Sequence, residues 1–392
     1  MRLGQLLAPA ILPAYATSGL RIARRVVRGH IRHPGTAEEI IAAVIERCWD
    51  GHRFAASGGQ FGQFWARDFG FAAPALVRLG YADRVDASLD WALDAWARAG
   101  RITTTIFAGG RPADVWDYGV DSLPLVLRAL RATPAGDLLV ARHARLLEAE
   151  VRTFGEVVVD PATGLVRAGR RLSTHRDTVA TSCNAYANAM VALLERELRA
   201  TGWFGVPFAP GAADRLVGAF WRGDHFAEGP VGSPDADVVT GDANVVPFWV
   251  EAVPDELGAA AMLSVLDGAG LADPLPLRYS ATRPTHEDRV QRLFVPDYQG
   301  TAIWTSLGAM ATEVALRADP PRGERWLGGH LGVVERDGTV WEVLDGALAP
   351  YRGRLGIWRA DEAMLWGAIL LDLARQARRI PRPGAPAEAR ME

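Results

Sequence analysis

The chain of 392 residues is 49% hydrophobic and carries a formal net charge of -3. This composition can bury a large core and excludes an intrinsically disordered protein, and the acidic balance argues against nucleic acid as the main partner. Two cysteines, Cys48 and Cys183, are too few for a disulfide framework, so we expect a cytoplasmic protein.

The first 33 residues differ from the rest. An apolar stretch broken by Pro9 and Pro13 precedes five arginines, whereas a secretory signal has its positive charges first and a membrane span is longer and unbroken. We expect residues 1–33 to be a basic amphipathic segment packed on the domain, with contact to a membrane surface or a partner as the lesser alternative. No linker divides residues 34–380, which we interpret as one domain, and the Pro- and Ala-rich tail 381–392 is expected to be disordered.

Helical periodicity dominates the domain. The first helix has a capping-box-like start at Thr36–Glu39 and apolar residues at helical spacing up to Cys48. Strand-like runs are few and short, at 101–106, 164–168 and 338–343. The further helices are predicted at 69–79, 82–99, 121–132, 136–154, 178–200, 211–221, 242–252, 255–267, 298–317, 322–335 and 360–379.

The predicted helices come in pairs in which one partner is almost entirely apolar. The apolar partners include 179–194, 303–316 and 364–373, and the other helix of each pair carries more Arg and Glu. Two concentric rings of helices would produce this alternation, and no βαβ rhythm suggests a parallel sheet. The sequence therefore predicts an all-α fold, an (α/α)6 toroid with a few short β segments in its loops.

Six clusters of aromatic, basic and acidic residues fall at helix starts and loop ends. Each alone is consistent with a helix cap. In a toroid, however, these positions converge on a central cleft. Aromatic faces can stack on sugar rings, and a carboxyl group held between them is desolvated, which raises its pKa as a general acid requires. The clusters are residues 65–68, 116–121, 173–177, 240–244, 298–300 and 341–342.

Four elements, in chain order, resemble the clan of toroidal glycosidases that includes amylo-1,6-glucosidase, processing glucosidase I and the mannosylglycerate and glucosylglycerate hydrolases. Residues 65–68 resemble the clan's W-x-R-D element, and 119–122 resemble the loop that carries its general-acid Asp. Residues 298–304 resemble its Y-x-G-x-x-x-W element, and 341–353 with the final apolar helix resemble the segment that carries its general-base Glu. The resemblance spans residues 60–375.

The resemblance implies an inverting glycoside hydrolase acting on a small α-linked glucoside or a related oligosaccharide. Asp121 would protonate the glycosidic oxygen and Glu342 would activate a water on the opposite face of the sugar, with their carboxyl groups about 6.5–9.5 Å apart. Arg67 and Asp68 would hold sugar hydroxyls. The other substrate-binding candidates, some of them walls of the site, are Trp65, Trp116, Asp117, Tyr118, Arg176, Asp242, Asn244, Tyr298, Gln299 and Trp304.

Several assignments stay open at this point. Asp117 competes with Asp121 for the role of acid, and Glu335 or Asp345 could replace Glu342 as base. Glu362 is interpreted as a charge in the first turn of the last helix. For four polar residues, the sequence is equally consistent with a substrate contact and a helix cap; these are Arg176, Asp177, Asp242 and Asn244. The side chains of Asn184 and Asn188 either form hydrogen bonds within the core or point into the cleft.

The sequence also favours an enzyme without cofactors. It has no phosphate loop or dinucleotide fingerprint, which predicts no organic cofactor, and the scattered histidines suggest no metal site. Two other functions remain as alternatives. A sugar epimerase would favour paired histidines over paired carboxylates, and in a non-catalytic glycan-binding toroid Asp121 and Glu342 would not face one another. The histidines in question are His175, His225, His286 and His330.

Overall fold

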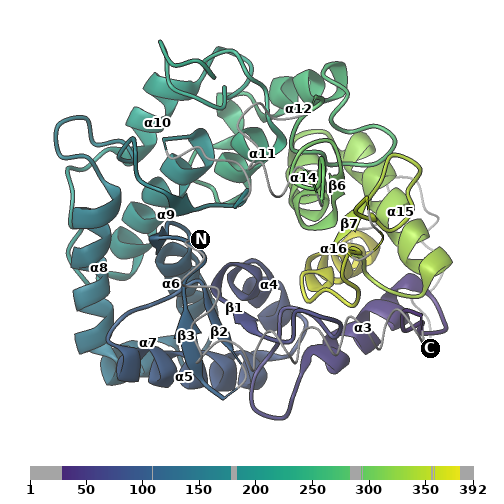
Figure 1. The fold of residues 1–392 in the computed structure, drawn as a ribbon, viewed down its shortest axis with the longest axis horizontal. Coiled ribbons are helices and arrows are strands. Elements are labelled where there is room, and N and C mark those ends of the chain that lie inside the picture. The colour runs from purple at the N-terminus through teal and green to yellow at the C-terminus, as the bar shows by residue number, and fades with distance from the viewer. Residues whose placement is uncertain are drawn as a thin grey trace, which may run out of the picture.

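The helices form two concentric rings around a central axis in the computed structural model (Figure 1). The structure describes residues 29–107, 109–177, 183–282, 293, 295–354, 356 and 358–379. The amphipathic segment predicted at 1–33, apart from its last five residues, and the predicted tail lie outside these ranges. In the described part, no helix is long and apolar enough to cross a membrane.

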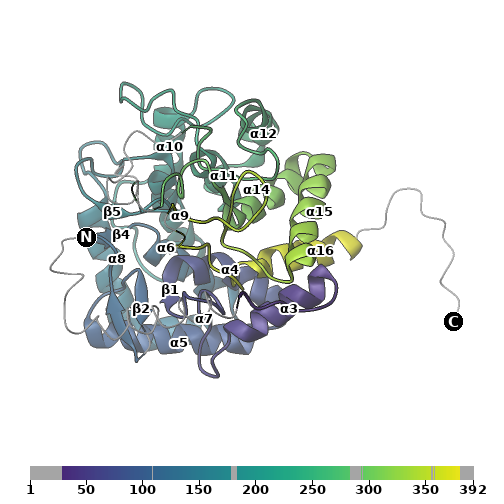
Figure 2. The ribbon, with the colours of Figure 1, turned by 45° about the vertical axis from the view of Figure 1, so that its right-hand side comes forward.

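The inner ring holds the most apolar helices. Each inner helix packs on the next, and the last one closes the ring against the first (Figure 2). The apolar runs predicted at 179–194, 303–316 and 364–373 fall largely in this ring, which confirms the predicted toroid. The inner helices are α4 (Ala66–Arg78), α6 (Ser122–Ala132), α9 (Ala185–Thr201), α11 (Gly241–Trp249), α14 (Thr305–Ala318) and α16 (Gly367–Arg379).

The outer ring consists of helices with one buried face. In α3 (Ala37–Cys48), the predicted capping box is present: the Glu39 N–H donates to the Thr36 hydroxyl, and the Thr36 N–H donates to the Glu39 carboxylate. The other outer elements are α5 (Ala82–Ala99), α7 (Gly136–Arg142), α8 (Ala144–Val158), α10 (Ala212–Phe220), the short 3-10 helix η1 (Asp255–Leu257), α12 (Ala259–Gly268) and α15 (Pro320–Asp337).

Some predicted boundaries are wrong. The helix predicted at 136–154 is two helices, because the backbone leaves the helical conformation at His143. The helix predicted at 298–317 begins at Thr305, since the residues before it form turns and a strand, and the last helix begins at Gly367 rather than residue 360. The strand predicted at 164–168 is a single β-bridge between Val159 and Val166. Of the strand predicted at 338–343, only Val343 lies in an observed strand, which continues to Leu344.

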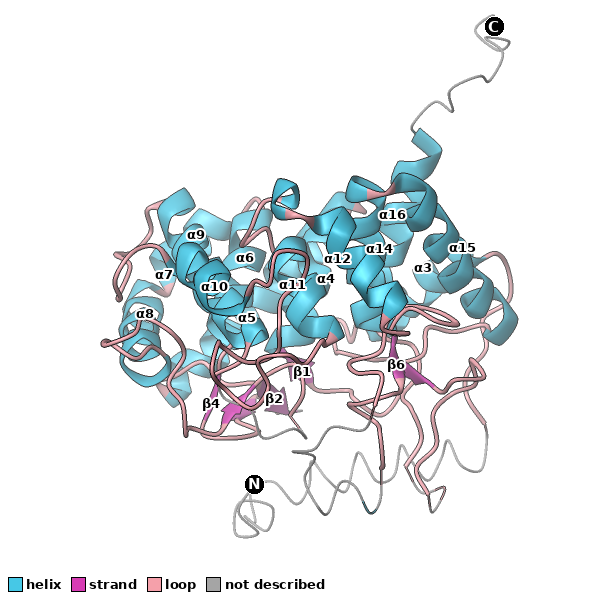
Figure 3. Cartoon of the chain, turned by 90° about the horizontal axis from the view of Figure 1, so that it is seen from above, coloured by secondary structure: helices cyan, strands magenta, loops and turns pink. Residues whose placement is uncertain are grey.

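Short strands gather at one end of the toroid (Figure 3). β1 (Phe64–Trp65), β2 (Thr105–Phe107) and β3 (Arg111–Ala113) form an antiparallel sheet. β4 (Tyr118–Gly119) pairs in parallel with β5 (Leu172–Ser173), and β6 (Ile303–Trp304) pairs antiparallel with β7 (Val343–Leu344).

The strands mark the end at which the inner helices begin. β1 leads directly into α4, and β6 leads directly into α14. Two residues separate the end of β4 from the start of α6. Because outer helices stand between successive inner ones in the chain, the inner helices run in the same direction. Their N-termini therefore converge on the end of the toroid that carries the strands and long loops.

The inner helices α4 and α6 cross closely enough to require a glycine. A Cβ atom on Gly70 would lie 2.5 Å from the Leu125 Cβ and 3.1 Å from the Leu125 carbonyl oxygen. We expect Gly70→Ala to lower the free energy of unfolding by about 1–3 kcal/mol through overpacking, measured by chemical denaturation. Gly332→Ala on α15, where the added methyl meets nothing within 4 Å, should instead be stabilising by up to about 1 kcal/mol. Equal effects of the two changes would contradict this explanation.

Candidate active site

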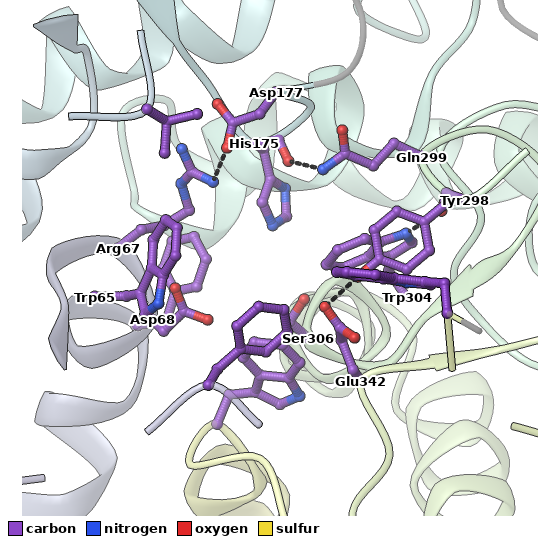
Figure 4. A pocket seen from close by; sticks show the side chains of 15 residues that line it. Trp65, Arg67, Asp68, His175, Asp177, Tyr298, Gln299, Trp304, Ser306 and Glu342 are labelled. Atoms are coloured by element: carbon purple, nitrogen blue, oxygen red, sulfur yellow. Dashed lines mark hydrogen bonds and ion pairs between the residues drawn. The ribbon is translucent and has the colours of Figure 1, made fainter. Parts of the chain in front are cut away.

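A cavity of about 240 Å³ lies where the starts of α4, α14 and α16 meet (Figure 4). This volume is below the range of about 300–1,000 Å³ typical of drug-sized ligands and suits a small molecule such as a single sugar ring. Aromatic side chains form most of its wall, and three carboxyl groups and one guanidinium group face it. The lining residues are Phe61, Trp65, Arg67, Asp68, Phe71, Val115, His175, Asp177, Tyr298, Gln299, Trp304, Ser306, Glu342, Trp358 and Trp366.

Seven of the predicted site residues line this cavity. They lie on strands and helix starts that the β1 and β6 pairings hold at the same end of the toroid. These seven are Trp65, Arg67, Asp68, Tyr298, Gln299, Trp304 and Glu342.

Arg67 connects three segments of the chain. Its Nε donates to the Asp121 carboxylate at 2.5 Å, at the start of α6. Its two terminal nitrogens donate to the Asp177 carboxylate at 3.3 Å and to the Ser173 hydroxyl at 3.0 Å, both in the segment before α9. Although burial opposes it, the two carboxylates hold the pKa of Arg67 well above its ordinary value. The guanidinium is therefore a permanent charge in the wall of the cavity.

Asp121 lies behind Arg67 and is not among the lining residues. Its side chain is fully buried, and one carboxylate oxygen accepts hydrogen bonds from both Arg67 and the Tyr186 hydroxyl, the latter at 2.7 Å. Burial raises the pKa of Asp121, and the Arg67 charge and the Tyr186 hydrogen bond oppose this. Asp121 is thus one side chain removed from the cavity, in a position where it orients Arg67.

Glu342 faces the cavity from the other side (Figure 4). The Tyr298 hydroxyl donates to one of its oxygens and the Asp361 N–H donates to the other at 2.9 Å. Burial, followed by the nearby Asp361 carboxylate, raises the pKa of Glu342 to about 8, although both hydrogen bonds lower it. Glu342 is thus a carboxyl group that exchanges its proton near neutral pH.

Asp68 adds a second carboxyl group of this kind. It lies in the first turn of α4, beside Arg67, and lines the cavity. Burial raises the pKa of Asp68 to about 7, and the positive charge of Arg67 partly offsets this. Asp68 can therefore offer either a donor or an acceptor to a ligand hydroxyl near neutral pH.

Trp116, Asp117 and Tyr118 do not line the cavity, although the preceding Val115 does. The Trp116 indole N–H donates to the Asp177 backbone carbonyl at 3.0 Å. Asp117 is exposed and does not line the cavity. The buried Tyr118 hydroxyl donates to Glu150 at 2.5 Å and thereby faces the outer ring.

Three further candidates hold the loops behind the cavity. Arg176 is buried and forms ion pairs with Asp242, at 3.1 Å, and Glu228. Burial raises the pKa of Asp242 to about 6, against the Arg176 charge. The Asn244 side-chain amide accepts a hydrogen bond from the Phe226 N–H and donates one to the Phe226 carbonyl. None of the three predicted residues lines the cavity, since each one's polar atoms face neighbouring loops.

The three carboxyl groups considered as the base differ in position. Glu335 accepts a hydrogen bond from the Ala37 N–H at the start of α3, and Asp345 accepts from the N–H groups of its own turn. Neither lines the cavity, whereas Glu342 does. Glu362 precedes α16 by several residues, so its interpretation as a first-turn charge is wrong.

The side chains of Asn184 and Asn188 form hydrogen bonds within the core and do not line the cavity. Asn184 caps α9, accepting from the Ala187 N–H at 2.8 Å. Asn188 accepts from the Val166 N–H at 3.0 Å and donates to the Asn184 carbonyl.

Several lining residues were not predicted. His175 and Asp177 lie in the cluster 173–177, and the sequence had left Asp177 between a substrate contact and a cap. The His175 ring is stacked on Tyr186, and burial lowers its pKa well below the ordinary value, so the ring is neutral. The residues without a chemical signal in the sequence are Phe61, Phe71, Val115, Ser306, Trp358 and Trp366.

Comparisons with known proteins give a fold but no sequence family. No protein-family model and no curated protein matches the chain. A solved glycosidase in complex with glucose superposes over 88% of this chain and 96% of its own, with a TM-score of 0.63 and 16% identity. A GH63 mannosylglycerate hydrolase from Thermus thermophilus, in complex with Tris and D-glycerate, covers 86% and 100% at a TM-score of 0.59 and 16% identity. The chain therefore has the six-hairpin toroid fold of these glycosidases.

The Tyr298 hydrogen bond predicts how the pKa of Glu342 responds to mutation. Tyr298→Phe removes a donor that stabilises the ionised carboxylate. A hydrogen bond of about 0.5–1.5 kcal/mol corresponds to a rise of about half a unit to one unit in the pKa of Glu342. The measurement is a carbon-13 NMR titration of glutamate-labelled protein, with Glu342→Gln to assign the signal. Tyr351→Phe, whose hydroxyl donates to the Pro296 carbonyl, is the matched control, and an unchanged pKa in Tyr298→Phe would refute the role of this contact.

Proposed function

We propose that this glycosidase-type toroid is an inverting glycoside hydrolase that cleaves a small α-linked glucoside or a related oligosaccharide. The proposal rests on one observation. Carboxyl groups flank an aromatic cavity, with Asp68 and Asp177 beside Arg67 and with Glu342 across from them (Figure 4). Inverting hydrolysis needs two carboxyl groups on opposite faces of the cleaved bond. Solved glycosidases of the same fold, one of them in complex with glucose, support glycoside hydrolysis as the reaction.

In this proposal Glu342 is the general base. Among the described residues, the Tyr298 hydroxyl donates to one of its oxygens and the Asp361 N–H donates to the other. A carboxylate oxygen can accept a further hydrogen bond, so Glu342 can also accept one from a water. These contacts hold the carboxylate in one orientation, as an effective base requires.

Asp177 takes the role of general acid in place of Asp121. An acid must reach the glycosidic oxygen, and the Asp177 side chain lines the cavity and is 18% exposed, whereas Asp121 is buried behind Arg67. The Ser173 hydroxyl donates to Asp177 at 2.6 Å, and Arg67 contacts its other oxygen. These contacts fix the orientation of the carboxyl group in the wall of the cavity.

The remaining polar and aromatic groups suit a sugar in the cleaved position. Asp68 and the Gln299 side-chain amide can bond ring hydroxyls, because amide and carboxyl groups together supply donors and acceptors. Trp65, Trp304 and Trp358 line the cavity with flat apolar faces, which suit the C–H faces of a pyranose ring.

The stereochemistry of the product tests the inverting mechanism. We expect proton NMR of the protein mixed with α-glucosides, α-mannosides and glucosylglycerate-type compounds to show prompt release of sugar as the β-anomer. Glu342→Gln should lower kcat by about 10²–10⁴-fold, because it removes the general base. Release of the α-anomer would exclude the inverting mechanism, and full activity of Glu342→Gln would exclude this base.

The dependence on the leaving group identifies the acid. Asp177→Asn should lower kcat by about 10²–10⁴-fold on an alkyl glucoside, whose oxygen needs a proton to leave. On α-glucosyl fluoride the loss should be much smaller, because the fluoride ion leaves with little help from an acid. Asp121→Asn is the matched comparison: because it disturbs Arg67 rather than the proton transfer, it should slow both substrates by a similar factor. The reverse pattern would return the acid role to Asp121.

The pH profile follows from the raised pKa of Glu342. The base works only when ionised, so kcat/KM, which reports the free enzyme, should rise with pH as Glu342 loses its proton around pH 8. Tyr298→Phe, which destabilises the ionised form, should move this limb to higher pH. An ascending limb near pH 4 in the unmodified protein would contradict the assignment of a buried base.

A further inference from the structure

The Ser306 hydroxyl lies on the wall of the cavity and has no hydrogen-bond partner among the described residues. Ser306 is 1% exposed and lines the cavity in the first turn of α14. A buried hydroxyl without a partner costs free energy, so such groups normally bind an ordered water or a ligand. Figure 4 shows Ser306 and Glu342 facing the same part of the cavity.

The position of Ser306 relative to Glu342 is held by the backbone. β6 pairs with β7, so that Trp304 lies opposite Val343, the residue after Glu342. The Thr305 N–H then donates to the Glu342 carbonyl at 3.2 Å. The start of α14 and the strand that follows Glu342 are thus joined in one register.

The neighbouring hydroxyl of Thr305 shows what a structural role looks like here. Thr305 donates to the Trp341 carbonyl at 2.5 Å and accepts from the Trp366 indole at 2.9 Å. Both contacts lock the helix start. Ser306, the next residue, makes no such contact within the described part of the chain, and its hydroxyl faces the cavity instead. The two adjacent hydroxyls therefore have different functions.

We propose that Ser306 holds the water that Glu342 activates, an inference that rests on the proposed inverting hydrolysis. One hydrogen of the water is donated to the Glu342 carboxylate and the other to the Ser306 hydroxyl oxygen, so that a lone pair of the water faces the anomeric carbon. As the water oxygen bonds to that carbon, Glu342 takes one proton, the glycosidic C–O bond breaks, and the acid gives its proton to the leaving oxygen. Ser306 is a positioning residue and exchanges no proton.

The test compares substitutions at two serines whose hydroxyl groups are buried. Ser306→Ala should lower kcat by about 10–100-fold, because the water loses one of its two anchors, and should leave KM within about twofold, since the sugar contacts remain. Ser306→Thr, which keeps the hydroxyl, should recover most of kcat. Ser233→Ala, in the loop before α11, is the matched control: its buried hydroxyl also lacks a partner among the residues described but does not line the cavity, so it should leave kcat unchanged.

The outcomes separate this inference from the proposed function. If the unmodified protein releases no sugar, the proposed function fails. If it releases sugar and Ser306→Ala keeps the full kcat, or loses activity only through KM or thermal stability, the role of Ser306 is refuted. A high-resolution crystal structure of the unmodified protein gives a readout that needs no turnover. We expect a water within hydrogen-bond distance of both Ser306 Oγ and the Glu342 carboxylate, and its absence would overturn the inference.

Discussion

The site depends on one buried cation, the guanidinium group of Arg67. Taking a charge out of water costs several kcal/mol unless it is paired and hydrogen-bonded. Arg67 therefore has to keep its contacts with Asp121, Asp177 and Ser173. These contacts join the starts of α4 and α6 to the segment before α9, which are far apart in the chain. Asp121, which does not line the cavity, neutralises and orients the cation that also contacts Asp177.

The second constraint is the common direction of the inner helices. Their N-termini converge on the cavity, and the partial positive charge of a helix N-terminus favours nearby carboxylates. Burial acts in the opposite sense and favours the neutral acid. For Asp68 and Glu342 burial prevails, with pKa values of about 7 and 8. The toroid thereby produces carboxyl groups that change protonation state near neutral pH, which ordinary surface carboxylates do not do.

The same arrangement explains why neighbouring residues have unrelated roles. In the segment 175–177, His175 and Asp177 face the cavity while Arg176 points the other way, to Asp242 and Glu228. At the start of α14, the Thr305 hydroxyl locks the backbone while the Ser306 hydroxyl faces the cavity. In both segments, neighbouring side chains point in different directions. The strand pairings β4–β5 and β6–β7 fix the backbone from which these side chains project.

The sequence by itself determined the helices, their pairing into two rings and the location of the polar clusters, because periodicity, caps and breaks are local properties of the chain. It also identified Trp65, Arg67, Asp68, Tyr298, Gln299, Trp304 and Glu342 as cavity residues, since these carry the chemistry of a sugar site. Only the tertiary structure decided which acid faces the cavity. Asp117, Asp121 and Asp177 look alike in the sequence, but one is exposed, one is buried behind Arg67 and one lines the wall. Phe61, Ser306 and Trp366 become site residues only when α4, α14 and α16 meet, because the rotation of each helix start depends on contacts between distant segments.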